Sequence, residues 1–512
     1  MKHRVPKSVA LFLALSAIAV AQDLASFEKR ITLKRLDNGL TVIICERPGA
    51  PVFSFNTHVD AGSVQDPMGQ TGLAHMFEHM AFKGTDKIGT TDYAAEKVAL
   101  AKVETAYAAY IAERDKRVGR DEQKLKDLQK AWQDAIADAQ KYVKPNAFPQ
   151  ILESNGAEGL NASTSEDQTE YHYSFTENRL ELWAYLESER FLHPVMREFY
   201  KERDVVREER RMRTESNPQG QLIEALSSTA FAAHPYKNGA AGWASDIENF
   251  RLKEAVQFYK TYYVPGNITI AIAGDVDPKE ARRLADKYFA RIPAGPLPPF
   301  VRTVEPPQTG EKRAAVESQA QPFIAIGYKR PDGNSKDDTP LDVLSEILAG
   351  GRTGLLYTEL VRDKRMALAA FAQSSYPGDK YANLFLFFLV PNLGHTNEEN
   401  EKAAYAIIER LKTKPVDPET LKRVRTKLRA ELIHKLDSNS GLAAELTAYH
   451  VAYGDWKRLF TELDEVNRVS AEDVQRVAKE YLVPQSRTVA FTTAAAAPPQ
   501  PAQTHATEAG HE

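Results

Sequence analysis

Residues 71–85, TGLAHMFEHMAFKGT, hold His75, Glu78 and His79 in the order H-x-x-E-H. On a helix, residues four positions apart lie on the same face, one turn from each other, so both imidazoles can reach one metal ion. Zn²⁺ accepts imidazole and carboxylate ligands, and a catalytic zinc site keeps one position open for water. The stretch therefore predicts a helix that carries two zinc ligands, with a glutamate beside them.

Two surface histidines on an ordinary amphipathic helix are the alternative interpretation. Against it, apolar side chains surround the pair and favour a buried helix: Leu73, Met76, Phe77, Met80 and Phe82. Buried histidines beside a buried glutamate need partners, and a metal ion satisfies them together. H-x-x-E-H is also the inverted form of the H-E-x-x-H pattern of zinc proteases. We therefore expect His75 and His79 to bind zinc and Glu78 to be the base for a zinc-bound water.

The stretch KERDVVREERRMRTE, farther along the chain, offers a third ligand. Glu202 and Glu209 are seven residues apart, nearly two helical turns, so they share a face. Val205 and Met212 lie on the same stripe, which predicts that this stripe faces the interior. A buried carboxylate needs a cation, so Glu209 is the predicted third ligand. A solvated helix with Glu–Arg pairs is the alternative. The rival ligand, Glu208, lies off the Glu202 face and is expected to pair with arginines.

Length, charge and the N-terminal residues limit the class of protein. A chain of 512 residues is long enough for two or more domains. The formal net charge of −4 argues against a nucleic-acid-binding protein. Residues 1–21 have a basic start, a short apolar run and the cleavage signal Ala19-Val20-Ala21, as in a secretory signal peptide. An uncleaved anchor is the alternative, but the run is short for a bilayer. We expect an exported protein, periplasmic or secreted, with no stable membrane span.

The order of strand-like and helix-like stretches predicts two similar αβ units, of which the second has no His-Glu-His cluster. Strand-like alternation begins at residue 31, and a charged helical hairpin about residues 93–143 turns near Val118 and Gly119. The hairpin is expected to be a solvated insertion, with a partner-binding arm as the alternative. The predicted parts are a signal peptide at 1–21, a zinc-bearing domain at 26–292, a proline-rich linker at 293–310, a silent repeat at 311–494 and a disordered tail at 495–512.

The stretch GLNASTSEDQTEYHYSF reads as one or two strands that border a loop, because Ser, Thr and aromatic residues alternate in it. Asn161 lies in this stretch, where an extended substrate can be held. An edge strand with a turn asparagine explains the same residue equally well.

The motifs GLAHMFEHMAFKGT and KERDVVREE together resemble the pitrilysin/insulinase family of zinc peptidases. The half-length bacterial members and the subunits of the mitochondrial processing peptidase are the most similar. The resemblance implies an α+β fold of two similar domains, each a mainly antiparallel sheet packed with helices, in a clamshell arrangement over an unfolded peptide. It further implies that His75, His79 and Glu209 bind Zn²⁺, that Glu78 is the catalytic base and that Glu202 supports catalysis.

The same resemblance implies how substrate is held. LNASTSED is similar to the segment that pairs with the substrate backbone, which gives Asn161 and Ala162 a substrate-binding role. Active members place an arginine and a tyrosine seven residues apart in the second half. Arg362 matches that arginine and is expected to bind substrate, but Ala369 stands at the tyrosine position. A homodimer, or a heterodimer with a related subunit that supplies the tyrosine, is therefore expected.

The expected function is that of a zinc-dependent metalloendopeptidase acting on unfolded peptides or short protein segments. One alternative is a non-catalytic partner or binding subunit of the same fold. The other is a periplasmic metal-binding or chaperone-like scaffold.

Overall fold

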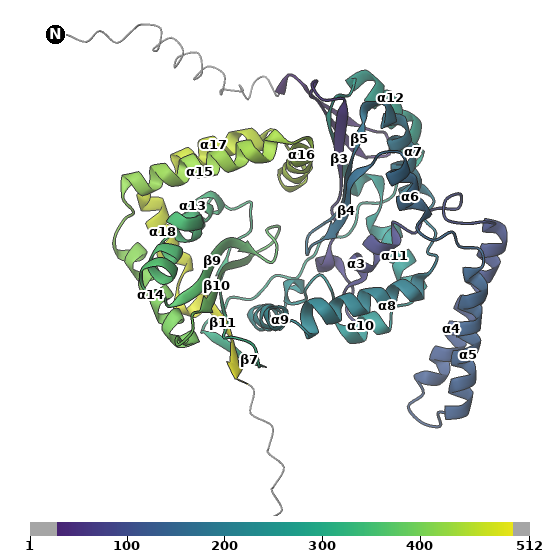
Figure 1. Ribbon diagram of the computed structural model, residues 1–512, viewed down its shortest axis with the longest axis horizontal. Helices are drawn as coiled ribbons and strands as arrows, with labels where there is room; N and C mark the ends of the chain where they lie inside the picture. The colour runs from purple at the N-terminus through teal and green to yellow at the C-terminus, as the bar shows by residue number, and fades with distance from the viewer. Residues whose placement is uncertain (1–27, 495–512) are drawn as a thin grey trace, which may run out of the picture.

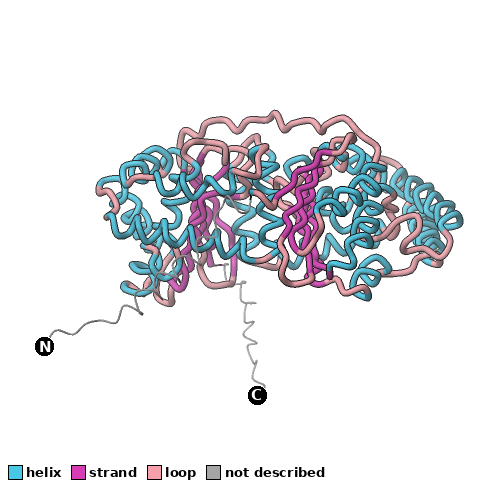
Figure 2. Tube along the Cα trace, turned by 90° about the horizontal axis from the view of Figure 1, so that it is seen from above, coloured by secondary structure: helices cyan, strands magenta, loops and turns pink. Residues whose placement is uncertain are grey.

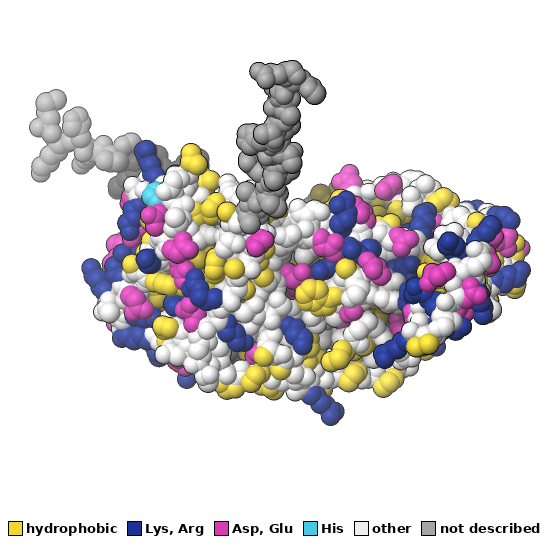
Figure 3. Space-filling view, turned by 90° about the horizontal axis from the view of Figure 1, so that it is seen from below, with side chains coloured by type: hydrophobic (Ala, Val, Ile, Leu, Met, Phe, Trp, Pro, Cys, Tyr) yellow, Lys and Arg dark blue, Asp and Glu magenta, His cyan; other side chains and the backbone are white. Residues whose placement is uncertain are grey.

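The computed structural model describes residues 28–494, which form two mixed sheets packed with helices (Figure 1). The predicted signal peptide (1–21) and the predicted tail (495–512) lie outside the described residues. Within residues 28–494, no helix combines the length and the apolar character needed to cross a membrane. On the face shown in Figure 3, basic and acidic side chains are interspersed over the surface.

The first sheet has six strands in the order β1-β2-β6-β3-β5-β4. Only the β2–β6 pair is parallel. The turn at Asn38 and Gly39 joins the first two strands as an antiparallel hairpin, and Gly39 adopts a φ of +99°, which favours glycine. The strands are β1 (Ile31–Arg35), β2 (Thr41–Glu46), β3 (Val52–Val59), β4 (Glu158–Thr164), β5 (Thr169–Thr176) and β6 (Ile268–Gly274).

Helices pack on one face of this sheet around a large apolar core, which includes Leu73, Met76 and Phe77 of the predicted metal helix. That helix is α3, and α8 carries the two predicted carboxylates. The helices of the first half are α3 (Leu73–Met80), α4 (Tyr93–Arg114), α5 (Glu122–Gln140), α6 (Ala147–Ser154), α7 (Leu180–Leu192), α8 (Phe199–Arg210), α9 (Pro218–Ala230), α10 (Ala244–Glu248), α11 (Leu252–Tyr262) and α12 (Pro278–Tyr288).

The second sheet repeats the first. Its order is β7-β11-β8-β10-β9, and only the β7–β11 pair is parallel, so its directions match those of β2-β6-β3-β5-β4. The predicted fold of two similar α+β domains is confirmed. The elements are β7 (Lys312–Ser318), β8 (Ile324–Arg330), β9 (Ala367–Tyr376), β10 (Asn383–Pro391), β11 (Arg487–Ala494), α13 (Asp338–Ala349), α14 (Asn397–Thr413), α15 (Pro418–Asp437), α16 (Asn439–Tyr453), α17 (Arg458–Arg468) and α18 (Ala471–Tyr481).

Each half covers one sheet face of the other half. Leu446 of α16 packs with Ile43 and Ala273 of the first sheet, and Leu222 of α9 packs with Ala325 of the second sheet. Helices accordingly lie between the two sheets as well as outside them (Figure 2). Burial of apolar surface stabilises a fold by about 25 cal/mol per Å², so the packing of α16 on the first sheet and of α9 on the second sheet holds the two halves together.

The predicted helical hairpin is formed by α4 and α5 and projects from the first half (Figure 1). Its helices are joined at residues 115–121, and Val118 in this turn is exposed. Its middle packs against α8 through Tyr107 and Trp132, whose rings lie against Tyr200. The hairpin is therefore solvated at the turn and packed along part of its length.

Candidate metal centre

The first turn of α3 is fixed by Asp66 and Gly72. The carboxylate of Asp66 accepts the backbone N–H groups of Gly72 and Ala74 at 2.6 and 2.9 Å. Burial raises the pKa of Asp66 to about 8, although these hydrogen bonds oppose the shift. Gly72 has a φ of +91°, and a Cβ there would lie 2.7 Å from the carbonyl oxygen of Ala241. Glycine is therefore required at the point where α3 begins.

Three predicted ligands converge. His75 Nε2 and His79 Nε2 are 3.3 Å apart, and Glu209 Oε2 lies 3.7 Å from the first and 3.4 Å from the second. Ligand atoms at about 2.0–2.2 Å from a tetrahedral zinc ion are about 3.3–3.6 Å apart. The two imidazoles and the carboxylate thus have the chemistry and the spacing that zinc requires, with one tetrahedral position left over.

Glu202 orients the second histidine. Its Oε1 lies 2.9 Å from His79 Nδ1, and its Oε2 lies 2.5 Å from Lys83 Nζ. A carboxylate on Nδ1 leaves Nε2 free to bind a metal. Burial of the His79 ring opposes its charge, but the hydrogen bonds that Glu202 and Glu209 accept from the ring outweigh burial and raise the pKa of His79 to about 9.

His75 differs from His79 in its pKa and in its hydrogen bonds. Burial lowers the pKa of His75 to about 4, so its ring is neutral at neutral pH, which is the form that binds metal. Its Nδ1 has no hydrogen-bond partner among the described residues. Outer contacts therefore hold His79 more firmly than His75.

Glu78 lies beside the histidines with one oxygen free. Thr164 Oγ1 donates to Glu78 Oε2 at 2.6 Å. Burial raises the pKa of Glu78, and the hydrogen bond from Thr164 opposes this. Glu78 and His79 line a cavity of about 360 Å³ together with Asn161 and Ala162. The predicted base, one of the two predicted histidine ligands and strand β4 thus line one cavity.

Asn161 and Ala162 lie on β4, the edge strand of the first sheet. Ala162 pairs with Tyr171 of β5 on one side, and within residues 28–494 no strand pairs with the other side of β4. An unpaired edge beside a cavity can accept an extended peptide as an added strand.

Arg362 is not brought to this cavity. It lies in the π-helical turn Tyr357–Asp363 of the second half, is exposed, and its Nε donates to Asp363 at 2.7 Å. Ala369, at the position where the resemblance places a tyrosine, lies in β9.

The prediction that Val205 and Met212 face the interior is wrong. Val205 and Met212 are 47% and 57% exposed, whereas Arg203 and Arg210 are buried. The guanidinium of Arg203 lies over the rings of Tyr107, Trp132 and Tyr200, and that of Arg210 lies over Trp243 and pairs with Glu224. Aromatic faces and carboxylates compensate these buried charges. Glu208 pairs with Arg211 at 2.6 Å, as expected.

Three further residues contact this region and were not predicted from the sequence: Lys83, Thr164 and Arg197. Lys83 follows His79 by four positions, the same spacing as between the histidines, so its place on the same side was a readable signal. Thr164 lies in the LNASTSED stretch, where hydroxyl residues alternate. Arg197 precedes α8 and had no pattern to mark it.

Both halves of the chain match known protein families. Residues 41–112 and 135–242 match the family described as Insulinase (Peptidase family M16), and residues 249–428 match the Peptidase M16 inactive domain. The chain belongs to peptidase family M16. The residues between the two matched segments of the insulinase family, 113–134, belong to the α4–α5 hairpin.

Individual M16 relatives match over nearly the whole chain. Zinc protease PqqE of Helicobacter pylori is 28% identical over 505 residues, which are 96% of this chain and 98% of that protein. The crystal structure of a protease from Helicobacter pylori has a TM-score of 0.75 at 28% identity and covers 90% of this chain and 99% of its own. Mitochondrial-processing peptidase subunit beta of Lentinula edodes is 24% identical over 91% of this chain and 90% of that subunit. The resemblance to zinc peptidases is thereby confirmed at the level of the family.

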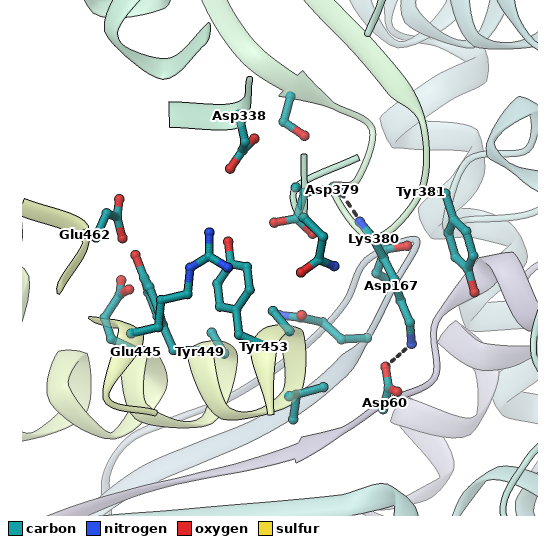
Figure 4. A pocket seen from close by; sticks show the side chains of 18 of the residues that line it. Asp60, Asp167, Asp338, Asp379, Lys380, Tyr381, Glu445, Tyr449, Tyr453 and Glu462 are labelled. Atoms are coloured by element: carbon teal, nitrogen blue, oxygen red, sulfur yellow. Dashed lines mark hydrogen bonds and ion pairs between the residues drawn. The ribbon is translucent and has the colours of Figure 1, made fainter. Parts of the chain in front are cut away.

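A larger cavity, about 680 Å³, lies where the two halves meet (Figure 4). It shares no lining residue with the cavity beside Glu78. Lys380 of the second half pairs there with Asp60 of the first. Further carboxylates line it: Asp167, Asp338, Asp342, Asp379, Glu445, Glu462 and Glu465.

Proposed function

We propose that the protein is a zinc-dependent metalloendopeptidase that hydrolyses unfolded peptides or short protein segments. The observation that carries the proposal is the convergence of His75 Nε2, His79 Nε2 and Glu209 Oε2 within 3.3–3.7 Å of one another, beside the carboxylate of Glu78. The names of M16 relatives, among them a zinc protease, support both the metal and the chemistry.

The residues of the chain divide the reaction between them. Zinc, when bound, supplies a Lewis acid that polarises a peptide carbonyl and makes water acidic. Glu78 accepts the proton of the attacking water at Oε1, because Thr164 occupies Oε2, and returns it to the leaving amine. Glu202 keeps the Nδ1–H of His79 engaged, so that Nε2 stays directed at the metal.

Substrate is held as an added strand on β4. Asn161 and Ala162 offer their backbone groups to an extended peptide, which brings its carbonyl past Glu78. Recognition through backbone hydrogen bonds tolerates many side chains. Only a segment that is already unfolded can lie along this edge, so stably folded proteins are not substrates.

Arg362 requires a second chain in this scheme. It is exposed and pairs with Asp363, and every residue that lines the cavity beside Glu78 belongs to the first half of the chain. We therefore propose a dimer with a second copy or a related subunit, in which Arg362 reaches substrate. The relative named as a processing-peptidase subunit supports such pairing. Light scattering of the purified protein tests it, since a strictly monomeric active enzyme contradicts it. Export to the periplasm or medium is proposed from residues 1–21 alone.

The decisive experiment is a peptidase assay on unstructured peptides, with and without a chelator, beside two matched variants. Glu78→Gln should keep its zinc and lose about 10²- to 10⁴-fold in kcat/KM, the usual contribution of a general base. Glu208→Gln, whose side chain pairs with Arg211 outside the centre, should match the wild type. Equal activity in Glu78→Gln refutes the assigned base. Zinc binding by the wild type without turnover favours the binding-subunit or scaffold function.

A further inference from the structure

Arg197 is almost fully buried, and all five of its N–H groups are used. Its Nε and Nη2 donate to the two carboxylate oxygens of Glu96 at 2.8 and 3.1 Å. Its Nη1 donates to the carbonyl oxygens of Lys83 and Ile88 at 2.6 and 2.9 Å, and Nη2 donates also to that of Thr85 at 2.7 Å. The guanidinium therefore connects several segments at once.

These segments are the ones that carry the metal centre. The turn containing Lys83 and Thr85 follows α3, the helix of the two histidines. Arg197 itself lies two residues before α8, the helix of Glu202 and Glu209. Glu96 belongs to α4 of the helical hairpin. One side chain thus joins the histidine helix, the carboxylate helix and the hairpin.

The contacts continue to a predicted ligand. Lys83, whose carbonyl accepts from Arg197, places its Nζ 2.5 Å from Glu202 Oε2. Glu202 Oε1 in turn lies 2.9 Å from His79 Nδ1. Displacing Arg197 therefore moves the groups that orient His79.

The pocket around the guanidinium has no spare room. A Cβ at Gly84 or Gly89 would lie 3.1 or 2.9 Å from Arg197 Nη1. Glu96 has no exposed surface, so its carboxylate depends on this partner. Lysine is a point charge without a planar fork and cannot replace the five directed hydrogen bonds.

The α4–α5 hairpin contacts α8 at a second place, around Arg203. Arg203 lies within 5.2–5.7 Å of the ring centres of Tyr107, Trp132 and Tyr200, and its Nη1 donates to Tyr107 Oη at 2.9 Å. Tyr107 and Trp132 belong to α4 and α5, whereas Arg203 and Tyr200 belong to α8. Two contacts on either side of Glu202 fix the position of that helix.

We propose that Arg197 is a positioning residue of the metal centre and that the α4–α5 hairpin is the support through which it acts. Arg197, bound to Glu96, sets the separation of α3 and α8, and hence the distances from Glu209 to His75 and His79. The inference rests on the proposed function only in that the centre must bind zinc.

The test uses the full chain and a matched pair of buried arginines. Arg197→Lys is compared with Arg330→Lys, because Arg330 of the second half is also buried, donates to the carbonyls of Pro331 and Ser374, and pairs with Asp338. Zinc affinity is measured by competition with a chelator, and the Tm of each metal-free variant is recorded. Arg197→Lys should weaken zinc binding about 10- to 100-fold, as loss of outer support does at other metal sites. Arg330→Lys should lower Tm with zinc affinity unchanged.

A reduced Tm with wild-type zinc affinity in Arg197→Lys overturns the proposal, and so does a wild-type protein that binds no zinc. If Arg197→Lys does not fold, Glu96→Gln and Arg203→Lys make the same comparison. Zinc binding without peptide cleavage by the wild type contradicts the peptidase function alone, because the affinity comparison needs no turnover.

Discussion

The carboxylate of Asp167, in the turn between β4 and β5, accepts the backbone N–H of Asp379, in the loop between β9 and β10, at 3.0 Å (Figure 4). The same carboxylate accepts the N–H of Lys380 at 3.2 Å and the hydroxyl of Tyr236 at 2.6 Å. Asp167 is buried. The turn that follows the proposed substrate strand is therefore bonded to the second half.

Asp167→Ala should lower the free energy of unfolding by about 1–3 kcal/mol, because it leaves the buried hydroxyl of Tyr236 without its acceptor. Urea unfolding measures the change. Asp379→Ala is the control, since the hydrogen bond uses the backbone of Asp379 and its exposed side chain is dispensable. Equal destabilisation by both variants contradicts the role of Asp167.

Glu209→Gln and Glu202→Gln should weaken zinc binding to different extents. Glu202 contacts His79 Nδ1, so its loss should cost about 10- to 100-fold in zinc affinity. Glu209 is the proposed ligand, so its loss should cost more. Chelator competition gives both values, and the reverse order would make Glu202 the better candidate for the ligand.

Lys329 should give the protein a rise in stability at alkaline pH. Burial lowers the pKa of Lys329 from 10.5 to about 8, although Glu305, 3.5 Å away, opposes the shift. Between these values the unfolded chain binds more protons than the folded one, so the free energy of unfolding rises with pH, by something of the order of 3 kcal/mol. Denaturant unfolding at pH 8 and pH 10 should show that the free energy of unfolding of the wild type rises over this range relative to that of Lys329→Met. An equal pH dependence in both proteins would be inconsistent with the lowered pKa.

Helices α9 and α16, each of which packs on the sheet of the other half, should make the two halves unfold together. Leu222→Ala on α9 and Leu446→Ala on α16 remove fully buried side chains, each at a cost of about 2–5 kcal/mol. Because each helix covers the sheet of the other half, either variant should shift a single calorimetric transition. Two separate transitions, only one of which moves in each variant, would show that the halves are independent.

The helix Leu73–Met80 and its burial were predictable because both follow from the same short stretch. His75, Glu78 and His79 lie within five residues of the chain, and Leu73, Met76 and Phe77 mark the buried face. The second sheet was predictable for a similar reason, since β10 contains the continuous apolar run LFLFFLV.

The orientation of α8 was harder to predict. Periodicity placed Val205 and Met212 inside, but the structure buries Arg203 and Arg210 there. Arginine is normally a surface residue, and only partners remote in sequence, Trp132 and Trp243 among them, make its burial favourable. A pattern read along one helix contains no information about those partners. The same limit hid Arg197, whose role depends on Glu96, about a hundred residues earlier.

The mutual covering of the sheets gives the second half a structural role, although it contributes no residue to the proposed metal centre. If the second half were removed, Ile43 and Ala273 would face water, and the exposed apolar face would make the remaining half prone to aggregate. Loss of the second half would therefore be seen first as a lower yield of folded protein.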